Sequence, residues 1–344
     1  SAMFGIELPI IQAPMSGSQG SALASAVSNA GGLGSLGAAM LMPDALHREM
    51  SAIAAATSRP YNVNFFVHRE PQFDAARDSA WRKVLAPYYA ELGVDPSTIP
   101  PPARRPRFDG SIISVLEQFK PRVVSFHFGL PDHELLMRVK GFGAKVISSA
   151  TTAEEARYLE SHGVDAVIAQ GLEAGGHRGM FLTDDLSTQV GTLALVRQVV
   201  RAVRVPVIAA GGIGDAESVA AAIALGAAGV QVGTAYLLCP EATTSAMHRA
   251  SLRDAELPTA VTNIFSGRPA RSILNRAMRE LGPMSGAAPA FPLAGAAIAP
   301  LRAKAEAAGL RDFTAAWSGQ NRRVHDLPAA ALTTDLARLV TGRP

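Results

Sequence analysis

Short apolar segments of strand length recur along the 344-residue chain, and they restrict its fold more than any other feature of the sequence. Several of them are apolar on both alternating faces, as expected for strands buried on both sides of a parallel sheet. There are eight of these segments, at residues 10–13, 33–36, 61–66, 123–126, 145–148, 166–169, 207–210 and 229–232. We therefore predict eight strands.

Segments with helical periodicity separate these strands. Thr152 and Glu155 have the spacing of a capping box, Asp215 can cap another helix that Gly226 ends, and apolar residues form a stripe at 193–203. Alternating strands and helices predict a parallel α/β fold. Eight repeats favour a closed (β/α)8 TIM barrel over the alternative, an open sheet.

Two segments are too long for single crossover connections. Residues 69–109 contain a helical stretch of their own at 81–92, and residues 237–324 follow the last predicted strand. Long excursions from a barrel lie at the carboxyl ends of the strands, where active sites and lids are built. We expect them to form an inserted, mainly helical lid or substrate domain, with the barrel comprising 3–68, 110–236 and 325–344.

The composition excludes several classes of protein. Thirty-two basic residues against 29 acidic ones give a net charge of only +3, which does not indicate a nucleic-acid partner. Cys239 is the single cysteine, so an intramolecular disulfide is excluded, and no spacing of histidines or carboxylates suggests a metal site. The sequence shows neither a long apolar span nor a signal-peptide pattern, so we expect a cytoplasmic protein without a membrane partner.

Glycine-rich joints follow the last two predicted strands. Residues 210–215 read Ala-Gly-Gly-Ile-Gly-Asp, and residues 231–234 read Gln-Val-Gly-Thr. Glycines let backbone N–H groups approach an anion at the start of a helix. Because these two loops form the usual phosphate site of a (β/α)8 barrel, we predict a phosphorylated cofactor or substrate there. The alternative is that the glycines only make tight turns.

A glycine-rich segment containing a histidine, residues 170–179, follows the sixth predicted strand. Its small residues allow close contact with a flat ligand and place His177 at the barrel mouth. Imidazole exchanges protons near neutral pH, so His177 is the candidate catalytic residue. His127 ends the fourth predicted strand and is either a second group at the mouth, in contact with substrate, or a structural residue.

The first and third predicted strands offer walls for a ring system. Pro14 fixes the backbone where the first strand ends, and the polarizable thioether of Met15 suits contact with an aromatic face. Asn62 and Asn64 share one face of their strand. These amides either hydrogen-bond a heteroaromatic edge or satisfy nearby backbone groups.

Together, these motifs resemble the FMN-dependent nitronate monooxygenases, formerly called 2-nitropropane dioxygenases, and within them the class I group. The resemblance covers nearly the whole chain. The segments that carry it are residues 12–15, 29–34, 62–66, 125–131, 173–179, 209–214, 231–234, 267–271 and 317–321.

The resemblance implies a flavoprotein barrel that holds FMN noncovalently and oxidises alkyl nitronates or nitroalkanes with O2, through a flavin semiquinone, to a carbonyl compound and nitrite. His177 matches the position of the catalytic base or nitronate-binding group. The implied FMN contacts are Gly212, Gly233 and Thr234 for the phosphate, Ala13, Pro14 and Met15 for the isoalloxazine, and Asn64, Gln170, Gly175, Gly176 and Gln231 for the rest of the cofactor.

Residues 294–297 depart from the pattern of some family members, because Ala-Gly-Ala-Ala stands where aromatic side chains are expected. This permits a bulkier substrate, with Ala297 as a candidate contact. Related barrels include FMN-dependent enoyl-thioester and quinone reductases that use NAD(P)H, and a noncatalytic barrel that binds flavin or a phosphate ligand is a further alternative. The composition is compatible with a monomer or a homodimer.

Overall fold

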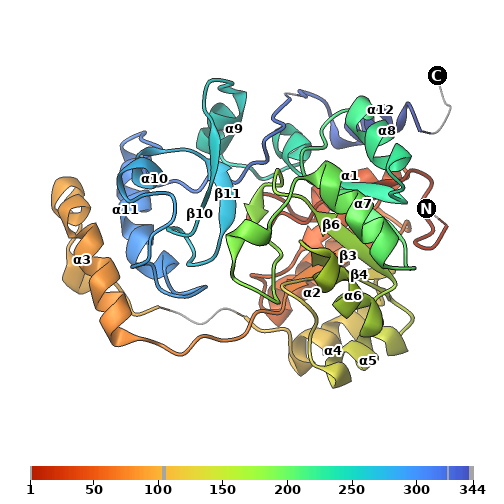
Figure 1. The fold of residues 1–344 in the computed structure, drawn as a ribbon, viewed down its shortest axis with the longest axis horizontal. Helices are drawn as coiled ribbons and strands as arrows, with labels where there is room; N and C mark the ends of the chain where they lie inside the picture. Colours follow the sequence, from red (N-terminus) through yellow and green to blue (C-terminus); the bar gives the residue numbers. More distant parts are fainter. Residues whose placement is uncertain (1, 103–105, 324, 341–344) are drawn as a thin grey trace.

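The computed structural model describes residues 2–102, 106–323 and 325–340, and an eight-stranded parallel sheet forms its centre (Figure 1). The strand order is β1-β9-β8-β6-β5-β4-β3-β2. A parallel bridge between Ile11 and Leu33 joins the two ends, where Gln12 N donates to Leu33 O at 3.0 Å. The sheet therefore closes, and the prediction of a (β/α)8 barrel is confirmed over the open alternative. Its strands are β1 (Ile10–Gln12), β2 (Gly34–Gly37), β3 (Tyr61–Phe66), β4 (Val123–His127), β5 (Lys145–Ala150), β6 (Ala166–Gln170), β8 (Val207–Ala210) and β9 (Gly229–Val232).

Helices cover the outside of this barrel (Figure 1). Asp215 caps α8 by accepting from Ser218 N at 2.9 Å, as predicted. Thr152 caps α6, but Glu155 does not complete the capping box, because its buried carboxylate accepts instead from Thr151 N at 2.7 Å. The helices are α1 (Ser21–Asn29), α2 (Pro43–Ala56), α4 (Gly110–Phe119), α5 (His133–Gly141), α6 (Ala153–Ser161), α7 (Thr192–Ala202), α8 (Ala216–Ala224) and α12 (Ala329–Ala337).

The barrel interior changes from apolar to polar along the strands. At the amino end, Phe4 and Ile6 pack with inward-facing apolar residues such as Ile147 and Ile208. At the carboxyl end, the side chains that point inward are polar or aromatic, and they border a cavity. Alternate residues of a strand point to the same face, so these side chains share the inner face with the apolar ones. These residues are Asn64, Phe66, His127, Ser149, Gln170 and Gln231.

A second apolar core lies beside the barrel. It is formed by residues between 81 and 99 and between 264 and 313, so it joins the two long excursions. Trp81 Nε1 donates to Ala294 O at 3.2 Å, and Tyr89 Oη donates to Ala297 O at 2.7 Å. Because the two excursions share this core, we propose that residues 69–109 and 237–324 form one unit. Its elements are α3 (Ala75–Leu92), η1 (Pro96–Thr98), α9 (Ala246–Arg253), β10 (Thr259–Thr262), β11 (Ala270–Ile273), α10 (Arg276–Glu280) and α11 (Gly295–Ala307), and η3 (Thr234–Leu238) spans its boundary with the barrel.

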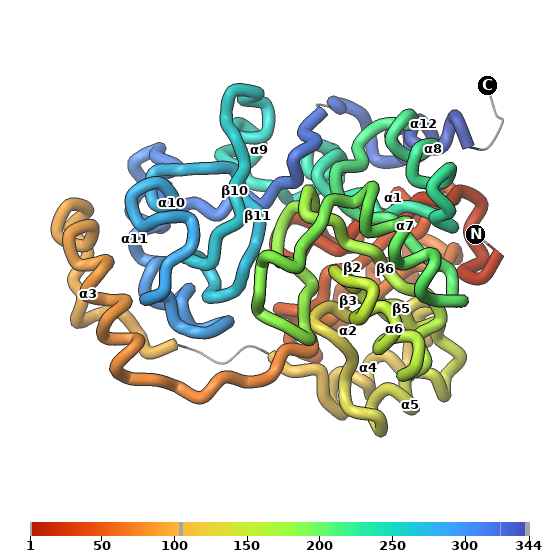
Figure 2. The backbone as a smooth tube through the Cα atoms, viewed as in Figure 1, coloured from red at the N-terminus to blue at the C-terminus, as the bar shows by residue number. Residues whose placement is uncertain are grey.

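A small antiparallel sheet, β10-β11-β7, links this unit to the barrel, and the sequence did not predict it. Strand β7 (Gly176–His177) belongs to the loop that follows β6, and η2 (Leu186–Thr188) comes after it. His177 pairs with Ala270 of β11, so the candidate catalytic residue lies at the junction. The tube in Figure 2 shows the chain leaving β3, running outward to α3 and returning toward α4.

Candidate active site

A cavity of about 920 Å³ opens at the carboxyl ends of the barrel strands and extends along the second unit. Ala297 does not line it, because its side chain is buried in the core between α11 and α3, although the adjacent Ala296 and Ile298 do. Apart from Asn62, the other candidate site residues line this one cavity: Ala13, Pro14, Met15, Asn64, His127, Gln170, Gly175, Gly176, His177, Gly212, Gln231, Gly233 and Thr234.

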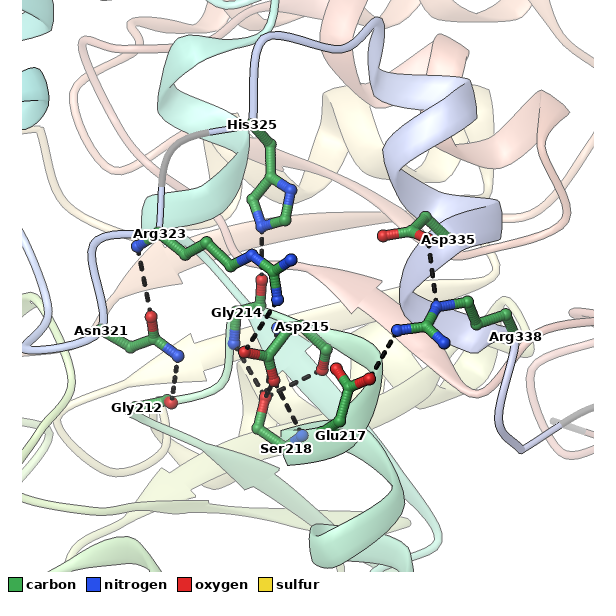
Figure 3. A network of polar contacts seen from close by, with 10 residues as sticks. All are labelled: Gly212, Gly214, Asp215, Glu217, Ser218, Asn321, Arg323, His325, Asp335 and Arg338. Carbon is green, nitrogen blue, oxygen red and sulfur yellow. Dashed lines mark hydrogen bonds and ion pairs between the residues drawn. The ribbon is translucent and has the colours of Figure 1, made fainter.

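Asn321 and His325, near the carboxyl end of the chain, fix the shape of the loop after β8 (Figure 3). Asn321 Nδ2 donates to Gly212 O at 3.0 Å, and His325 Nε2 donates to Gly214 O at 2.7 Å. Gly212 adopts a φ of +70°, a left-handed conformation that favours glycine. Hydrogen bonds from Ser218, aided by the nearby Arg323, lower the pKa of Asp215 and keep this cap ionised. The carbonyl groups of Gly212 and Gly214 are therefore hydrogen-bonded. The first turn of α8 follows this loop and lies at the carboxyl end of the barrel, where the cavity opens.

The loop after β9 forms the neighbouring wall together with residues 318–319. Thr234 Oγ1 accepts from Gly319 N at 2.9 Å. A Cβ on Gly175, in the loop after β6, would lie 2.5 Å from Gly319 N, so only glycine fits where that loop crosses residues 318–319. Gln231 Oε1 is buried at the cavity wall without a hydrogen-bond partner among the described residues. Unpaired buried polar atoms are costly, so this acceptor is available to a hydrogen-bond donor of a bound ligand.

The imidazole of His177 is fixed from the second unit. Its Nε2 lies 2.9 Å from Ser266 Oγ, a buried hydroxyl that also lines the cavity. Sequence reasoning missed Ser266, although it directly precedes the family-like segment 267–271. A hydroxyl can donate or accept, so Ser266 can partner either protonation state of the ring.

Two side chains of the barrel hold the backbone of His177. Gln170 Nε2 and His127 Nε2 donate to His177 O at 3.0 and 3.1 Å, and Gln170 Oε1 accepts from Gly179 N at 2.7 Å. His127 Nδ1 lies 3.0 Å from Ser149 Oγ. Loss of hydration lowers the pKa of His127 to about 4, with Arg268 and Arg178 acting in the same direction. His127 is therefore neutral at pH 7, with both ring nitrogens engaged.

Arg178, fully buried next to His177, is another residue that the sequence reasoning missed. Its guanidinium donates to Gly171 O at 2.7 Å, to Gln170 O at 2.8 Å and to Gln189 Oε1 at 3.0 Å. Burial lowers its pKa to about 10, which leaves it charged at neutral pH. It fixes the loop that carries His177.

Aromatic rings surround the His177 imidazole. Their centroids lie 5.2 Å (Phe291), 5.4 Å (Trp317), 5.9 Å (Phe66) and 6.0 Å (Phe128) from that of the imidazole. Phe128 has a φ of +73°, a strained conformation for a residue with a side chain. The surroundings of His177 are thus largely apolar, which strengthens electrostatic interactions made by the ring.

The amides on β3 also point into the barrel, as their spacing predicted. Asn64 Nδ2 and Asn62 Nδ2 each lie 2.9 Å from Ser125 Oγ, and only Asn64 reaches the cavity wall. Cys239 is buried, which raises the pKa of its thiol to about 12 and makes it a poor nucleophile. Within the described ranges, no group of three or more candidate metal ligands occurs, and no helix is both long and apolar enough to cross a bilayer.

Comparison with known proteins identifies the family of this chain. The sequence profile of a family described as nitronate monooxygenase matches residues 1–338. A nitronate monooxygenase from Pseudomonas aeruginosa is 42% identical over 352 residues, which cover 99% of this chain and 98% of that protein. Nitroalkane oxidase from Streptomyces ansochromogenes matches with a TM-score of 0.88 and 40% identity over 98% of this chain and 97% of its own. FabK from Thermotoga maritima is more distant, with a TM-score of 0.71 and 28% identity over 97% of this chain and 93% of its own. The chain therefore belongs to the nitronate monooxygenase family and is an oxidoreductase.

Proposed function

We propose that this protein uses FMN to oxidise alkyl nitronates with O2, giving a carbonyl compound and nitrite. The observation that carries the proposal is the position of His177, fixed by Ser266 in a cavity that also reaches both glycine-rich loops. Membership of the family and similarity to the nitroalkane oxidase from Streptomyces ansochromogenes support the same reaction.

The residues around the cavity fit FMN. The loops at Gly212 and Gly233 suit its phosphate, because they follow the last two barrel strands and lack side chains that would block an anion. The unpaired Gln231 Oε1 suits a hydrogen-bond donor of the ring or ribityl chain. Met15 lies on the same wall, and a Cβ added to Gly233 would lie 3.8 Å from the Met15 Sδ atom. When bound, FMN would supply the electron transfer between nitronate and O2.

His177 would bind the nitro group of the substrate. A nitronate is already an anion, so a ring N–H that donates to a nitronate oxygen stabilises it without a proton transfer. With a neutral nitroalkane, the unprotonated ring would instead take the proton from the carbon that bears the nitro group. In either case Ser266 sets the ring orientation, and the surrounding aromatic rings make the environment of the imidazole largely apolar.

An absorbance spectrum after incubation with FMN, followed by anaerobic mixing with ethyl nitronate and separately with NADH, tests the proposal. We expect a bound flavin that the nitronate reduces rapidly and that NADH leaves oxidised. His177→Asn should retain FMN and lose about two orders of magnitude or more in nitronate turnover. His133→Asn, which changes an exposed histidine on α5 away from the cavity, is the matched control and should not alter turnover.

Other outcomes would replace the proposal with one of its alternatives. Rapid reduction by NADH with no reaction toward nitronates would indicate an NAD(P)H-dependent reductase on the same barrel. Failure to bind flavin would indicate a barrel without flavin chemistry. Full nitronate turnover by His177→Asn would refute the role of that residue while leaving the reaction in place.

A further inference from the structure

We infer that Gln12 and Gln19 are positioning residues for the flavin. They hold residues 13–15, the cavity-wall segment, through hydrogen bonds that replace a missing part of the barrel sheet. This inference rests on the proposed function, in which the cavity-wall segment borders the isoalloxazine, and it adds two residues that act through that segment. Its basis is the seam where β1 meets β2 and the barrel closes.

The backbone ladder across this seam ends at Leu33. Leu33 N donates to Ile10 O at 2.9 Å, and Gln12 N donates to Leu33 O at 3.0 Å. In a parallel pair, the next hydrogen bonds would join Ser35 to residues 12 and 14, two positions further along each strand. Pro14 has no N–H to donate to Ser35 O, so the ladder cannot continue in full.

Side chains replace the backbone groups where the ladder ends. Gln12 Oε1 accepts from Ser35 N at 2.9 Å, and Gln19 Nε2 donates to Ser35 O. Two residues further along β2, Ser16 Oγ donates to Gly37 O at 3.1 Å. A side chain between two strands needs more space than a direct backbone pair, whose strands lie about 4.8 Å apart. The two strands therefore diverge toward the cavity, and the cavity-wall segment leaves the sheet on the side of β2.

The cavity-wall segment is instead held from two other directions. Ala13 N donates to Val232 O of β9 at 2.7 Å, and Met15 N donates to Gln19 Oε1 at 3.0 Å. Gln12 Nε2 donates to both Gln19 Oε1 and Ala13 O. The two glutamines thus form one hydrogen-bonded unit that joins the cavity-wall segment to β2.

Each glutamine uses its amide as a donor and as an acceptor at the same time. A glutamate would keep only the acceptor, and an apolar side chain would lose both. Gln12 is fully buried, so loss of its amide would leave Ser35 N without this partner and away from water. Movement of the chain can restore a partner, so we expect the cavity-wall segment to shift when either amide is lost. Binding sites need their groups held within about 0.5 Å, so the bound flavin should report such a shift.

Gln19→Met tests this inference, because it keeps the length of the side chain but removes its donor and its acceptor. We expect the FMN dissociation constant, measured by flavin fluorescence, to rise about tenfold, which corresponds to the loss of about one hydrogen bond. The visible absorbance and circular dichroism of the bound flavin should change, and kcat for ethyl nitronate should fall more than its KM changes. Gln118→Met, at an exposed position on α4 outside the cavity lining, is the matched control and should alter none of these quantities.

Gln12→Met and the double variant test whether the two glutamines act as one unit. Because both act through the cavity-wall segment, the double variant should raise the FMN dissociation constant little more than the larger single effect. Urea denaturation of the FMN-free proteins separates positioning from a purely structural role, since a loss of stability alone leaves the properties of the bound flavin unchanged. Gln19 is only half-buried, so Gln19→Met decides the outcome if the fully buried Gln12 does not tolerate methionine.

An unchanged flavin spectrum and FMN dissociation constant in Gln19→Met, where the wild type binds FMN and oxidises the nitronate, would overturn the inference and leave the proposed function intact. Lower stability with unaltered flavin properties would do the same, because the glutamines would then only close the barrel. Additive effects of the two substitutions would also overturn it, because they would exclude action through one segment. Failure of the wild type to bind FMN would count against the proposed function itself.

Discussion

Acidification should destabilise this protein through His127, the neutral histidine that holds the backbone of His177. Its pKa falls from 6.5 in the unfolded chain to about 4 in the folded protein, a difference that corresponds to about 3 kcal/mol. Below pH 6.5 the unfolded chain binds a proton that the folded chain does not bind until about pH 4. The free energy of unfolding should therefore be highest above pH 6.5 and should fall by up to about 3 kcal/mol as the pH drops to 4.

Urea denaturation of the wild type and His127→Gln at pH 7, 5.5 and 4 isolates this contribution. A glutamine amide can still donate to His177 O but cannot take up the proton, so the wild type should lose up to about 3 kcal/mol relative to the variant between pH 7 and pH 4. His133→Asn, at an exposed position, controls for the loss of an imidazole as such. Parallel pH dependences of wild type and His127→Gln would refute the reasoning, because titration of other groups cancels in the difference.

Four further substitutions test how His177 and the loop that carries it are held in place. Arg178→Met removes three hydrogen bonds to buried acceptors and should lower the free energy of unfolding by about 3–5 kcal/mol; a loss below about 1 kcal/mol in urea denaturation would contradict this. Gly175→Ala places a Cβ 2.5 Å from a backbone nitrogen and should abolish FMN retention on gel filtration. Gly176→Ala, whose Cβ meets nothing within 4 Å, should cost only about 1–2 kcal/mol for its φ of +72° and retain FMN, so equal loss by both variants would exclude the clash as the cause. Ser266→Ala should lower kcat about tenfold and shift its pH profile; an unchanged profile would show that the hydroxyl does not act through His177.

The strands could be predicted because their signal is local. Each segment of the barrel carries its own apolar pattern, and the period of two places Asn62 and Asn64 on one face of their strand without knowledge of the partner strand. The cap at Asp215 is local in the same sense, since donor and acceptor lie three residues apart. Closure of the barrel could be predicted from the number of strand–helix repeats, without knowledge of any single strand pairing.

The small antiparallel sheet could not be predicted in the same way. Strand β7 has only two residues, Gly176 and His177, and a period cannot be read from two positions. Its partners, Ala270 and Arg271, come from a distant part of the chain, where β11 is only four residues long. Tertiary contacts decide the conformation of both segments, and single-sequence patterns do not contain them.

The polar residues that hold the loop were missed for a related reason. A charged side chain in a glycine-rich loop is usually solvated, so Arg178 gave no sign that it would be buried. Its partners include Gln189, which lies in the turn before α7, and two backbone carbonyls that only the folded loop brings together. The glycines themselves were informative, because a close backbone approach such as that of Gly175 tolerates no other residue.

His177 depends on both halves of the molecule. The barrel fixes its backbone through Gln170 and His127, whereas the second unit fixes its ring through Ser266 and pairs with its strand through Ala270. A displacement of one unit against the other would therefore turn the imidazole relative to the glycine-rich loops of the barrel. Changes in the second unit that leave every barrel residue in place should thus alter turnover, because the site is complete only when the two units are docked.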